Sequence, residues 1–180
     1  MRKKIIIAAI SFLMLAGFSS LSIAQETENE SDITNRFGVG YRFGWMDDDD
    51  DTSTIVPDVD QKHSALLIYG LSPYTALQLE GSYATNWDFD TEFYSLFADL
   101  QLRMPMEEMA AYIFGGVGLQ NQDFDDIFDS EDSMAWRAGI GAEYFMTEQT
   151  AVNAEGIYNF DDGDATFNSW ELRLGLSYYF

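Results

Sequence analysis

The sequence contains no cysteine, a single histidine and only three prolines in 180 residues. Without cysteine it can form neither disulfides nor thiolate metal sites. Basic residues are also scarce: nine Lys and Arg stand against 31 Asp and Glu, which gives a formal net charge of −22. So acidic a chain is not expected to bind nucleic acid, because that binding depends on Lys and Arg neutralising phosphates. We also expect no cofactor.

Long apolar runs are missing except near the amino terminus, where residues 5–18 are apolar. This run follows Arg2, Lys3 and Lys4 and is succeeded by small and polar residues up to Ala24. The pattern predicts a secretory signal peptide over residues 1–24. The alternative, a transmembrane anchor, is disfavoured because the run is short for a bilayer and an acidic spacer follows it. Elsewhere no apolar stretch approaches the length of a membrane-spanning helix, which argues against a helical membrane protein.

Removal of the signal peptide would leave six basic residues, since three of the nine lie at Arg2, Lys3 and Lys4. The 31 acidic residues would all remain. Residues 25–35 are polar and acidic and are interpreted as a flexible leader on the periplasmic side. Residues 36–180 are predicted to form one folded domain.

The carboxyl-terminal segment 169–180, S-W-E-L-R-L-G-L-S-Y-Y-F, alternates strictly between apolar residues and polar, small or amphipathic ones. Such alternation sends the two sets to opposite faces of a β-strand. A strand of a soluble sandwich would rarely carry Glu and Arg on its second face and end on an aromatic residue. The pattern is typical of the last strand of an outer-membrane barrel, with its apolar face toward lipid and its polar face toward the lumen.

The same alternation predicts seven further strands, over residues 36–45, 62–71, 75–87, 92–103, 110–119, 134–146 and 151–158. In 62–71 the favoured lipid face is Ala65, Leu67, Tyr69 and Leu71, but Leu66 and Ile68 blur the alternation and leave the register open. The register of 110–119 also stays open, because small or apolar residues occur on both of its faces. Long connections at 46–61, 120–133 and 159–168 and a shorter loop at 88–91 alternate with tight turns. This asymmetry is that of barrels with long external loops and tight periplasmic turns.

With these features and its terminal Tyr179-Phe180, the sequence resembles the small eight-stranded outer-membrane β-barrels, a family that includes opacity-protein-like and outer-membrane protein A or X-like barrels. The resemblance implies an all-β antiparallel transmembrane barrel in the outer membrane of a Gram-negative bacterium. It also implies contact with outer-membrane lipid and lipopolysaccharide, and insertion by the barrel-assembly machinery. Tyr179 and Phe180 resemble the signal that this machinery reads. We expect a monomer.

Aromatic residues near the strand ends are predicted to form two girdles at the membrane interfaces, where amphipathic rings are favoured. One girdle lies beside the long connections and the other near the opposite strand ends. The predicted members are Trp45, Trp87, Trp136, Trp170, Tyr112, Tyr144, Tyr178 and Phe180.

The predicted inward faces carry a nearly balanced set of charges. Eight strands leave room only for side chains in the lumen, and buried charges must pair. The favoured interpretation is a salt-bridge plug, and the transmembrane domain of outer-membrane protein A has a similar network. The alternative is a gated, narrow, cation-preferring channel. The residues are Arg36, Arg42, Glu80, Asp99, Arg103, Arg137, Glu143, Glu155, Glu171 and Arg173.

Most of the acidic residues lie in the four long connections, including the run 47–51. Carboxylate-rich loops attract divalent cations, but the run lacks the spaced ligands and central glycine of an EF-hand. We therefore expect diffuse cation association, bridging to lipopolysaccharide phosphates, and no defined metal site. The usual meaning of such runs is a solvated loop.

Some small barrels are lipid-modifying enzymes, notably lipid A deacylases and palmitoyltransferases. The only histidine, His63, adjoins Ser64, but adjacent residues of a strand face opposite sides and cannot form a nucleophile–base pair. The deacylase pattern of His and Ser two residues apart on a late strand is absent. We expect no enzyme. A structural or surface-interaction protein with acidic external loops is favoured, and the channel is the alternative.

Deletion of Phe180 should sharply reduce insertion into the outer membrane, because the assembly machinery would lose the terminal aromatic residue. The amount of heat-modifiable protein in isolated outer membranes measures this. An unchanged yield would contradict the proposed role of the terminus.

Overall fold

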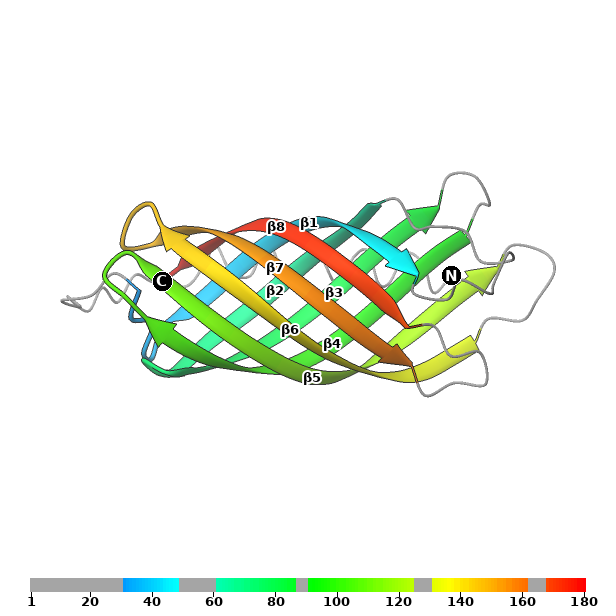
Figure 1. Ribbon diagram of the computed structural model, residues 1–180, viewed down its shortest axis with the longest axis horizontal. Coiled ribbons are helices and arrows are strands. Elements are labelled where there is room, and N and C mark those ends of the chain that lie inside the picture. Colours follow the sequence, from blue (N-terminus) through cyan, green and yellow to red (C-terminus); the bar gives the residue numbers. More distant parts are fainter. Residues whose placement is uncertain (1–30, 49–60, 87–90, 125–130, 162–167) are drawn as a thin grey trace.

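The computed structural model describes residues 31–48, 61–86, 91–124, 131–161 and 168–180. Its eight strands close into one antiparallel barrel in sequence order, with β1 paired to both β2 and β8 (Figure 1). The predicted fold is therefore confirmed as a closed eight-stranded barrel. The strands are β1 (Phe37–Asp48), β2 (Gln61–Ser72), β3 (Thr75–Asn86), β4 (Thr91–Pro105), β5 (Met109–Phe124), β6 (Glu131–Phe145), β7 (Thr150–Asp161) and β8 (Ser169–Tyr179).

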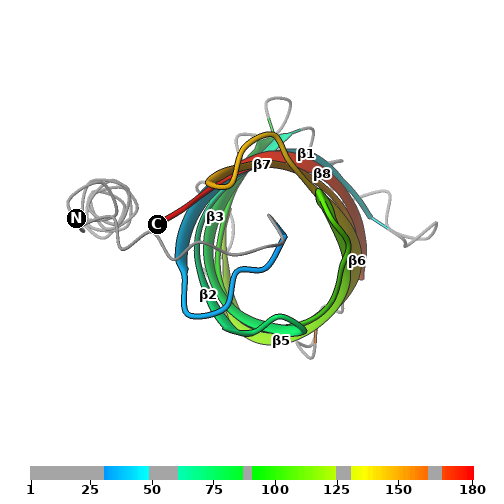
Figure 2. The ribbon, with the colours of Figure 1, turned by 90° about the vertical axis from the view of Figure 1, so that its left-hand side faces the viewer.

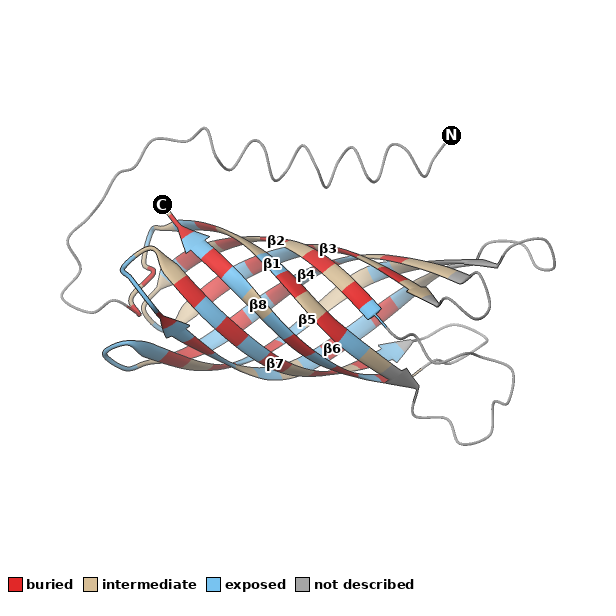
Figure 3. Cartoon of the chain, turned by 90° about the horizontal axis from the view of Figure 1, so that it is seen from above, coloured by how far each residue is buried: buried red, intermediate tan, exposed pale blue. Residues whose placement is uncertain are grey.

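The alternating sequence of each strand gives the barrel two chemically different surfaces. In β8, Arg173 is fully buried, whereas its neighbours Leu172 and Leu174 are 60% and 55% exposed. Buried and exposed residues alternate in the same way along the other strands (Figure 3). The inner surface carries the charged side chains together with some buried apolar ones, and the outer surface is apolar, which is the inverse of a water-soluble protein. No helix in the described ranges is long and apolar enough to cross a membrane.

The structure decides the two registers that the sequence leaves open. In β2, Leu66 and Ile68 are buried inside, so the outer face carries Ala65, Leu67, Tyr69 and Leu71. In β5, Tyr112 and Phe114 point inward and Ile113 is 55% exposed on the outside.

The glycines of β5 leave room for inward side chains of its neighbour β4. A Cβ atom at Gly116 would lie 2.1 Å from Asp99 Oδ1. One at Gly118 would lie 2.5 Å from Phe97 Cδ1. Both contacts are shorter than van der Waals packing allows, so these two positions are kept small by charged and aromatic groups inside the barrel.

Strand pairing continues further than the alternation predicts. The segment 120–133 is expected to be one long connection, yet β5 runs to Phe124, β6 begins at Glu131, and Gln122 pairs with Glu131. This part of the prediction is wrong, because backbone hydrogen bonds extend an antiparallel pair without any need for apolar side chains. Residues 125–130 lie outside the described part of the chain.

The segment ahead of β1 is not the flexible leader that its composition suggests. Ser31 and Ile33 have no exposed surface, and the segment turns into one end of the barrel. We call this end, which carries the turns β2–β3, β4–β5 and β6–β7, the short-turn mouth. Figure 2 looks into it and shows the blue segment turning into the opening. Residues 25–30 and the predicted signal peptide lie outside the described residues.

A charge on the outer wall should destabilise the barrel. Ile140 is 67% exposed in the middle of β6, opposite Ile113 and Gly156. Replacing it by Arg should cost about 2–4 kcal/mol of unfolding free energy, because the guanidinium would lie in lipid. Urea titration of the protein folded into lipid vesicles measures the change.

The matched control is Glu107→Arg, in the exposed β4–β5 turn, which should leave the urea midpoint nearly unchanged. Equal midpoints for both variants would show that the wall around Ile140 does not face lipid.

Candidate functional site: the ion-pair network of the barrel interior

Among the described residues, ten charged side chains lie inside the barrel, each no more than 5% exposed. Five are basic and five are acidic, so the interior is formally neutral although the whole chain is strongly acidic. Six of the ten form a central cluster, described below, to which every strand except β2 and β5 contributes one residue. The ten residues are Arg42, Lys62, Arg103, Arg137, Arg173, Glu80, Asp99, Glu143, Glu155 and Glu171.

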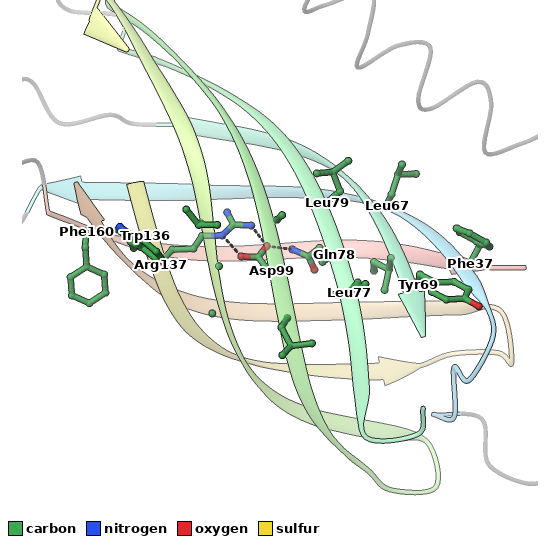
Figure 4. A pocket seen from close by; sticks show the side chains of 16 residues that line it. Phe37, Leu67, Tyr69, Leu77, Gln78, Leu79, Asp99, Trp136, Arg137 and Phe160 are labelled. Carbon is green, nitrogen blue, oxygen red and sulfur yellow. Dashed lines mark hydrogen bonds and ion pairs between the residues drawn. The ribbon is translucent and has the colours of Figure 1, made fainter. Parts of the chain in front are cut away.

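Arg137 of β6 crosses the interior to reach two carboxylates on β3 and β4. Its Nη1 and Nη2 donate to Glu80 Oε1 and Oε2 at 3.1 and 2.9 Å, a bidentate arrangement that fixes the planar guanidinium. Its Nε donates to Asp99 Oδ1 at 2.8 Å, and the guanidinium lies 4.2 Å from the centre of the Phe97 ring. Figure 4 shows Arg137 and Asp99 joined, with Gln78 donating to the same aspartate.

Glu80 is the acid on which three arginines converge. Besides Arg137, it accepts a hydrogen bond from Arg173 of β8, and its Oε2 lies 3.7 Å from Nη1 of Arg42 on β1. Arg42 and Arg173 also reach Glu155 of β7, at 2.9 and 3.3 Å. The central cluster therefore ties together strands that are distant around the barrel wall.

Two further ion pairs lie on either side of this central cluster. Lys62 donates to Glu171 at 2.5 Å, and Asn159 donates to the same oxygen at 2.6 Å. Toward the short-turn mouth, Arg103 donates to Glu143 at 2.8 Å. Glu143 also accepts a hydrogen bond from the Tyr179 hydroxyl at 2.7 Å. Each of the five buried cations thus has at least one buried carboxylate partner.

The structure places nine of the ten predicted lumen charges inside the barrel, and the exception is Arg36. Arg36 precedes β1, after the chain turns at Asn35 with φ of 59°, so strand alternation does not apply to it. Its guanidinium donates to the Glu148 carbonyl at 2.5 Å at the rim of the short-turn mouth. Lys62 is the fifth interior cation, which sequence reasoning missed. Lys62 shares its side of β2 with Leu66 and Ile68, opposite the favoured lipid face, and this alternation was the available signal.

The structure places most of the predicted girdle residues on the outer wall. Trp45, Trp136 and Trp170 are about half exposed on the outer wall, whereas Trp87 lies outside the described residues. Tyr144 and Tyr178 are exposed near the short-turn mouth. Phe180, which is half-buried there, donates its backbone N–H to the Phe37 carbonyl at 2.7 Å.

The placement of Tyr112 in a girdle is wrong. It faces inward with 5% exposure and donates its hydroxyl to Glu155 at 2.7 Å. The physical reason is the register of β5, in which Ile113 occupies the lipid side. Tyr179 also faces inward and lies next to Phe145, with ring centres 5.6 Å apart.

The single histidine and its neighbouring serine lie on opposite sides of the wall. His63 Nδ1 is 2.6 Å from the Tyr41 hydroxyl on the outer surface, beside the ring of Phe43. Ser64 is buried inside and accepts a hydrogen bond from Arg173 at 3.3 Å. They cannot exchange a proton directly. Among the described residues no group of three His, Asp or Glu side chains is arranged to hold a metal ion.

The outer wall carries a shallow groove of about 800 Å³. Its lining includes the outward side chains of Leu77, Leu79 and Trp136 (Figure 4). This surface is apolar and belongs to the lipid-facing side of the barrel.

A closed antiparallel barrel with an apolar outer wall and an ion-paired interior defines the class of membrane-spanning β-barrels. The chain belongs to the outer membrane protein beta-barrel domain family, whose family model matches residues 10–180. This membership places the protein in the outer membrane of a Gram-negative bacterium.

Solved structures of small outer-membrane barrels share this fold. Neisserial surface protein A matches with a TM-score of 0.68 and 15% identity, over 80% of this chain and 97% of its own. Ail, the attachment invasion locus protein of Yersinia pestis, matches with a TM-score of 0.57 and 13% identity, over 82% and 99%. The outer membrane enzyme PagL matches with a TM-score of 0.50 and 10% identity, over 78% and 98%. Identities this low establish the fold alone. Among curated proteins no significant match to the sequence is found.

Removing the shared acid of the central cluster should destabilise the barrel strongly. In Glu80→Gln, the guanidinium groups of Arg42, Arg137 and Arg173 would keep their positive charges with one buried carboxylate fewer. Breaking a buried ion pair from one side typically costs about 3–5 kcal/mol of unfolding free energy. The urea midpoint in vesicles measures the loss.

Glu107→Gln, in the exposed β4–β5 turn, is the matched control and should fold with an unchanged midpoint. If both variants unfold at the same urea concentration, the central ion pairs do not stabilise the barrel.

Proposed function

We propose that this protein is a structural or surface-interaction barrel that does not conduct ions. Its interior is closed by the ion-pair network, and its contacts with other molecules are made by the long acidic connections on the cell exterior. The observation that carries the proposal is the full set of partners inside the barrel. Each of the five buried basic side chains lies within ion-pair distance of a buried carboxylate.

The energetics of such pairs support closure. Taking an ion out of water costs several kcal/mol, and the charges inside recover this only while they remain paired. An eight-stranded barrel is just wide enough for its own side chains, so an ion would have to displace them. The network would then fill the lumen and leave no path for ions.

The placement of the long connections follows from the rule for bacterial barrels, whose long loops face the exterior and whose short turns face the periplasm. The connections 49–60, 87–90, 125–130 and 162–167 hold twelve of the 31 acidic residues and would then present these carboxylates to the medium. At that position they would attract divalent cations and bridge through them to lipopolysaccharide phosphates. The name of Ail, an attachment invasion locus protein, supports a surface role for a barrel of this shape. The proposed protein is a monomer inserted by the barrel-assembly machinery.

A narrow cation-preferring channel is the second candidate, and one observation favours it. Several buried polar atoms of the described interior have no hydrogen-bond partner, among them Arg103 Nε and Asn159 Oδ1. Buried polar atoms are nearly always satisfied by protein or by ordered water. Water molecules held beside these atoms would be the starting point of a conducting path.

A lipid-modifying activity, as in the outer membrane enzyme PagL, is the least supported function. It would need a nucleophile hydrogen-bonded to a base. Here the only histidine is on the outer wall beside Tyr41, while Ser64 is inside beside Arg173. We infer that the protein is not a hydrolase of this kind.

The refolded protein in a planar lipid bilayer should show no discrete conductance steps. Heat-modifiable gel mobility of the same sample is the control that the barrel has folded. Absence of conductance from a sample with the gel mobility of folded protein supports a closed interior. The external connections would then be the functional part.

Cation-selective steps would overturn this proposal, provided that they change in Arg137→Ala or Glu143→Ala. These two positions sample the central cluster and the pair nearest the short-turn mouth. Steps of unchanged size in both variants would come from defects in the bilayer and not from the lumen.

A further inference from the structure

The six residues ahead of β1 are bound in the short-turn mouth as a short peptide would be. Ile33 has no exposed surface, although it belongs to no strand. It packs in an apolar cluster formed by inward residues of five strands, β2, β3, β6, β7 and β8. The other members are Ile68, Ala76, Phe145, Ala151 and Tyr179.

The backbone of the segment is fixed to β2 at a glycine. Thr34 forms a parallel β-bridge with Gly70, Asn35 N–H donates to the Gly70 carbonyl at 2.8 Å, and Gly70 N–H donates to the Arg36 carbonyl at 3.1 Å. A Cβ atom at Gly70 would lie 1.9 Å from the Ile33 carbonyl oxygen. Only glycine therefore lets the segment approach β2 this closely.

Side chains tie the segment to two more elements of the mouth. Ser31 donates its hydroxyl to the Met106 carbonyl in the β4–β5 turn. Arg36 donates to the Glu148 carbonyl in the β6–β7 turn at 2.5 Å. With the bridge to Gly70 near the β2–β3 turn, the segment is held at all three turns that surround the opening.

We propose that residues 31–36 are a built-in stopper, a peptide bound in cis that seals the short-turn mouth. Its seal is apolar and lies outside the charged interior. Tyr179 links the two parts, because its ring belongs to the cluster around Ile33 and its hydroxyl donates to Glu143. Solute entering at this end must displace the stopper before it meets the ion pairs. This inference concerns the mouth and does not depend on whether the interior conducts.

The absence of native cysteine allows a direct test in the full-length protein. A single cysteine replaces Ala151, which is fully buried on the inner wall of the mouth. Its rate of reaction with a bulky, water-soluble maleimide reports whether the mouth is sealed. Thr147→Cys in the exposed β6–β7 turn is the reference for unhindered reaction.

Gly70→Ala is the variant expected to release the stopper, because the added methyl collides with the Ile33 carbonyl. Gly156→Ala is the matched control, since a Cβ at Gly156 meets no atom within 4 Å. The Ala151→Cys thiol should react slowly alone and with Gly156→Ala. With Gly70→Ala it should react faster by about tenfold or more, as buried groups react through opening of the structure that covers them.

Equally fast reaction of Ala151→Cys and Thr147→Cys in the otherwise native chain would overturn the proposal, because the mouth would already be open. No acceleration by Gly70→Ala in a barrel with folded, heat-modifiable mobility would overturn it as well. If Gly70→Ala fails to fold, Ile33→Asp replaces it. That variant places a carboxylate in the apolar cluster and leaves the strands unchanged, and the same acceleration is expected.

Bilayer conductance of Gly70→Ala separates this inference from the proposed function. Fast reaction of the Ala151→Cys thiol in a barrel that shows no conductance supports both the stopper and the closed network. A fast-reacting mouth in a conducting barrel supports the stopper and overturns the closed network.

Discussion

Backbone hydrogen bonding is the constraint on which this structure depends. In lipid no water is available to satisfy an exposed N–H or C=O group, so strands can cross only as a closed barrel without edges. The pairing of β1 with β8 supplies that closure over eleven residue pairs, from Gly38 with Tyr179 to Asp48 with Ser169. Once the ring is closed, every strand must offer lipid one face and the interior the other. The alternation of apolar and polar residues follows from this requirement.

Closure with eight strands makes the interior narrow, and this determines how its charges behave. Long side chains from opposite sides of the wall meet in the middle, as Arg137 of β6 meets Glu80 of β3. Inward positions on β5 are occupied by glycine where neighbouring side chains take the space, as Gly116 does beside Asp99. The interior is thus a charged core, and its stability depends on every cation keeping a carboxylate partner.

The two ends of the barrel differ. At the short-turn mouth, the segment around Ile33 adds an apolar layer over the charged core, and Tyr179 belongs to both layers. The opposite end carries the longer, acidic connections, which lie outside the described residues. The surface-interaction role proposed above would place binding at the outer wall and at those connections.

The sequence alone determined the number of strands, their antiparallel order and the side of the wall on which most residues lie. These properties are local, because successive side chains of a strand point to opposite faces. The sequence of each strand therefore determines which of its residues face lipid. The outward face of β8 can be predicted without knowledge of any other strand. It carries Leu172, Leu174 and Leu176. Tertiary structure alone decided the partners of Glu80, the inward position of Tyr112 and the exchange of Arg36 for Lys62 in the core. It also decided the burial of Ile33, in a segment whose polar composition predicts a flexible leader. Those properties depend on which strands stand opposite each other across the lumen and on where a segment meets a turn distant in sequence. The closure of the barrel sets both, and no single stretch of the chain carries that information.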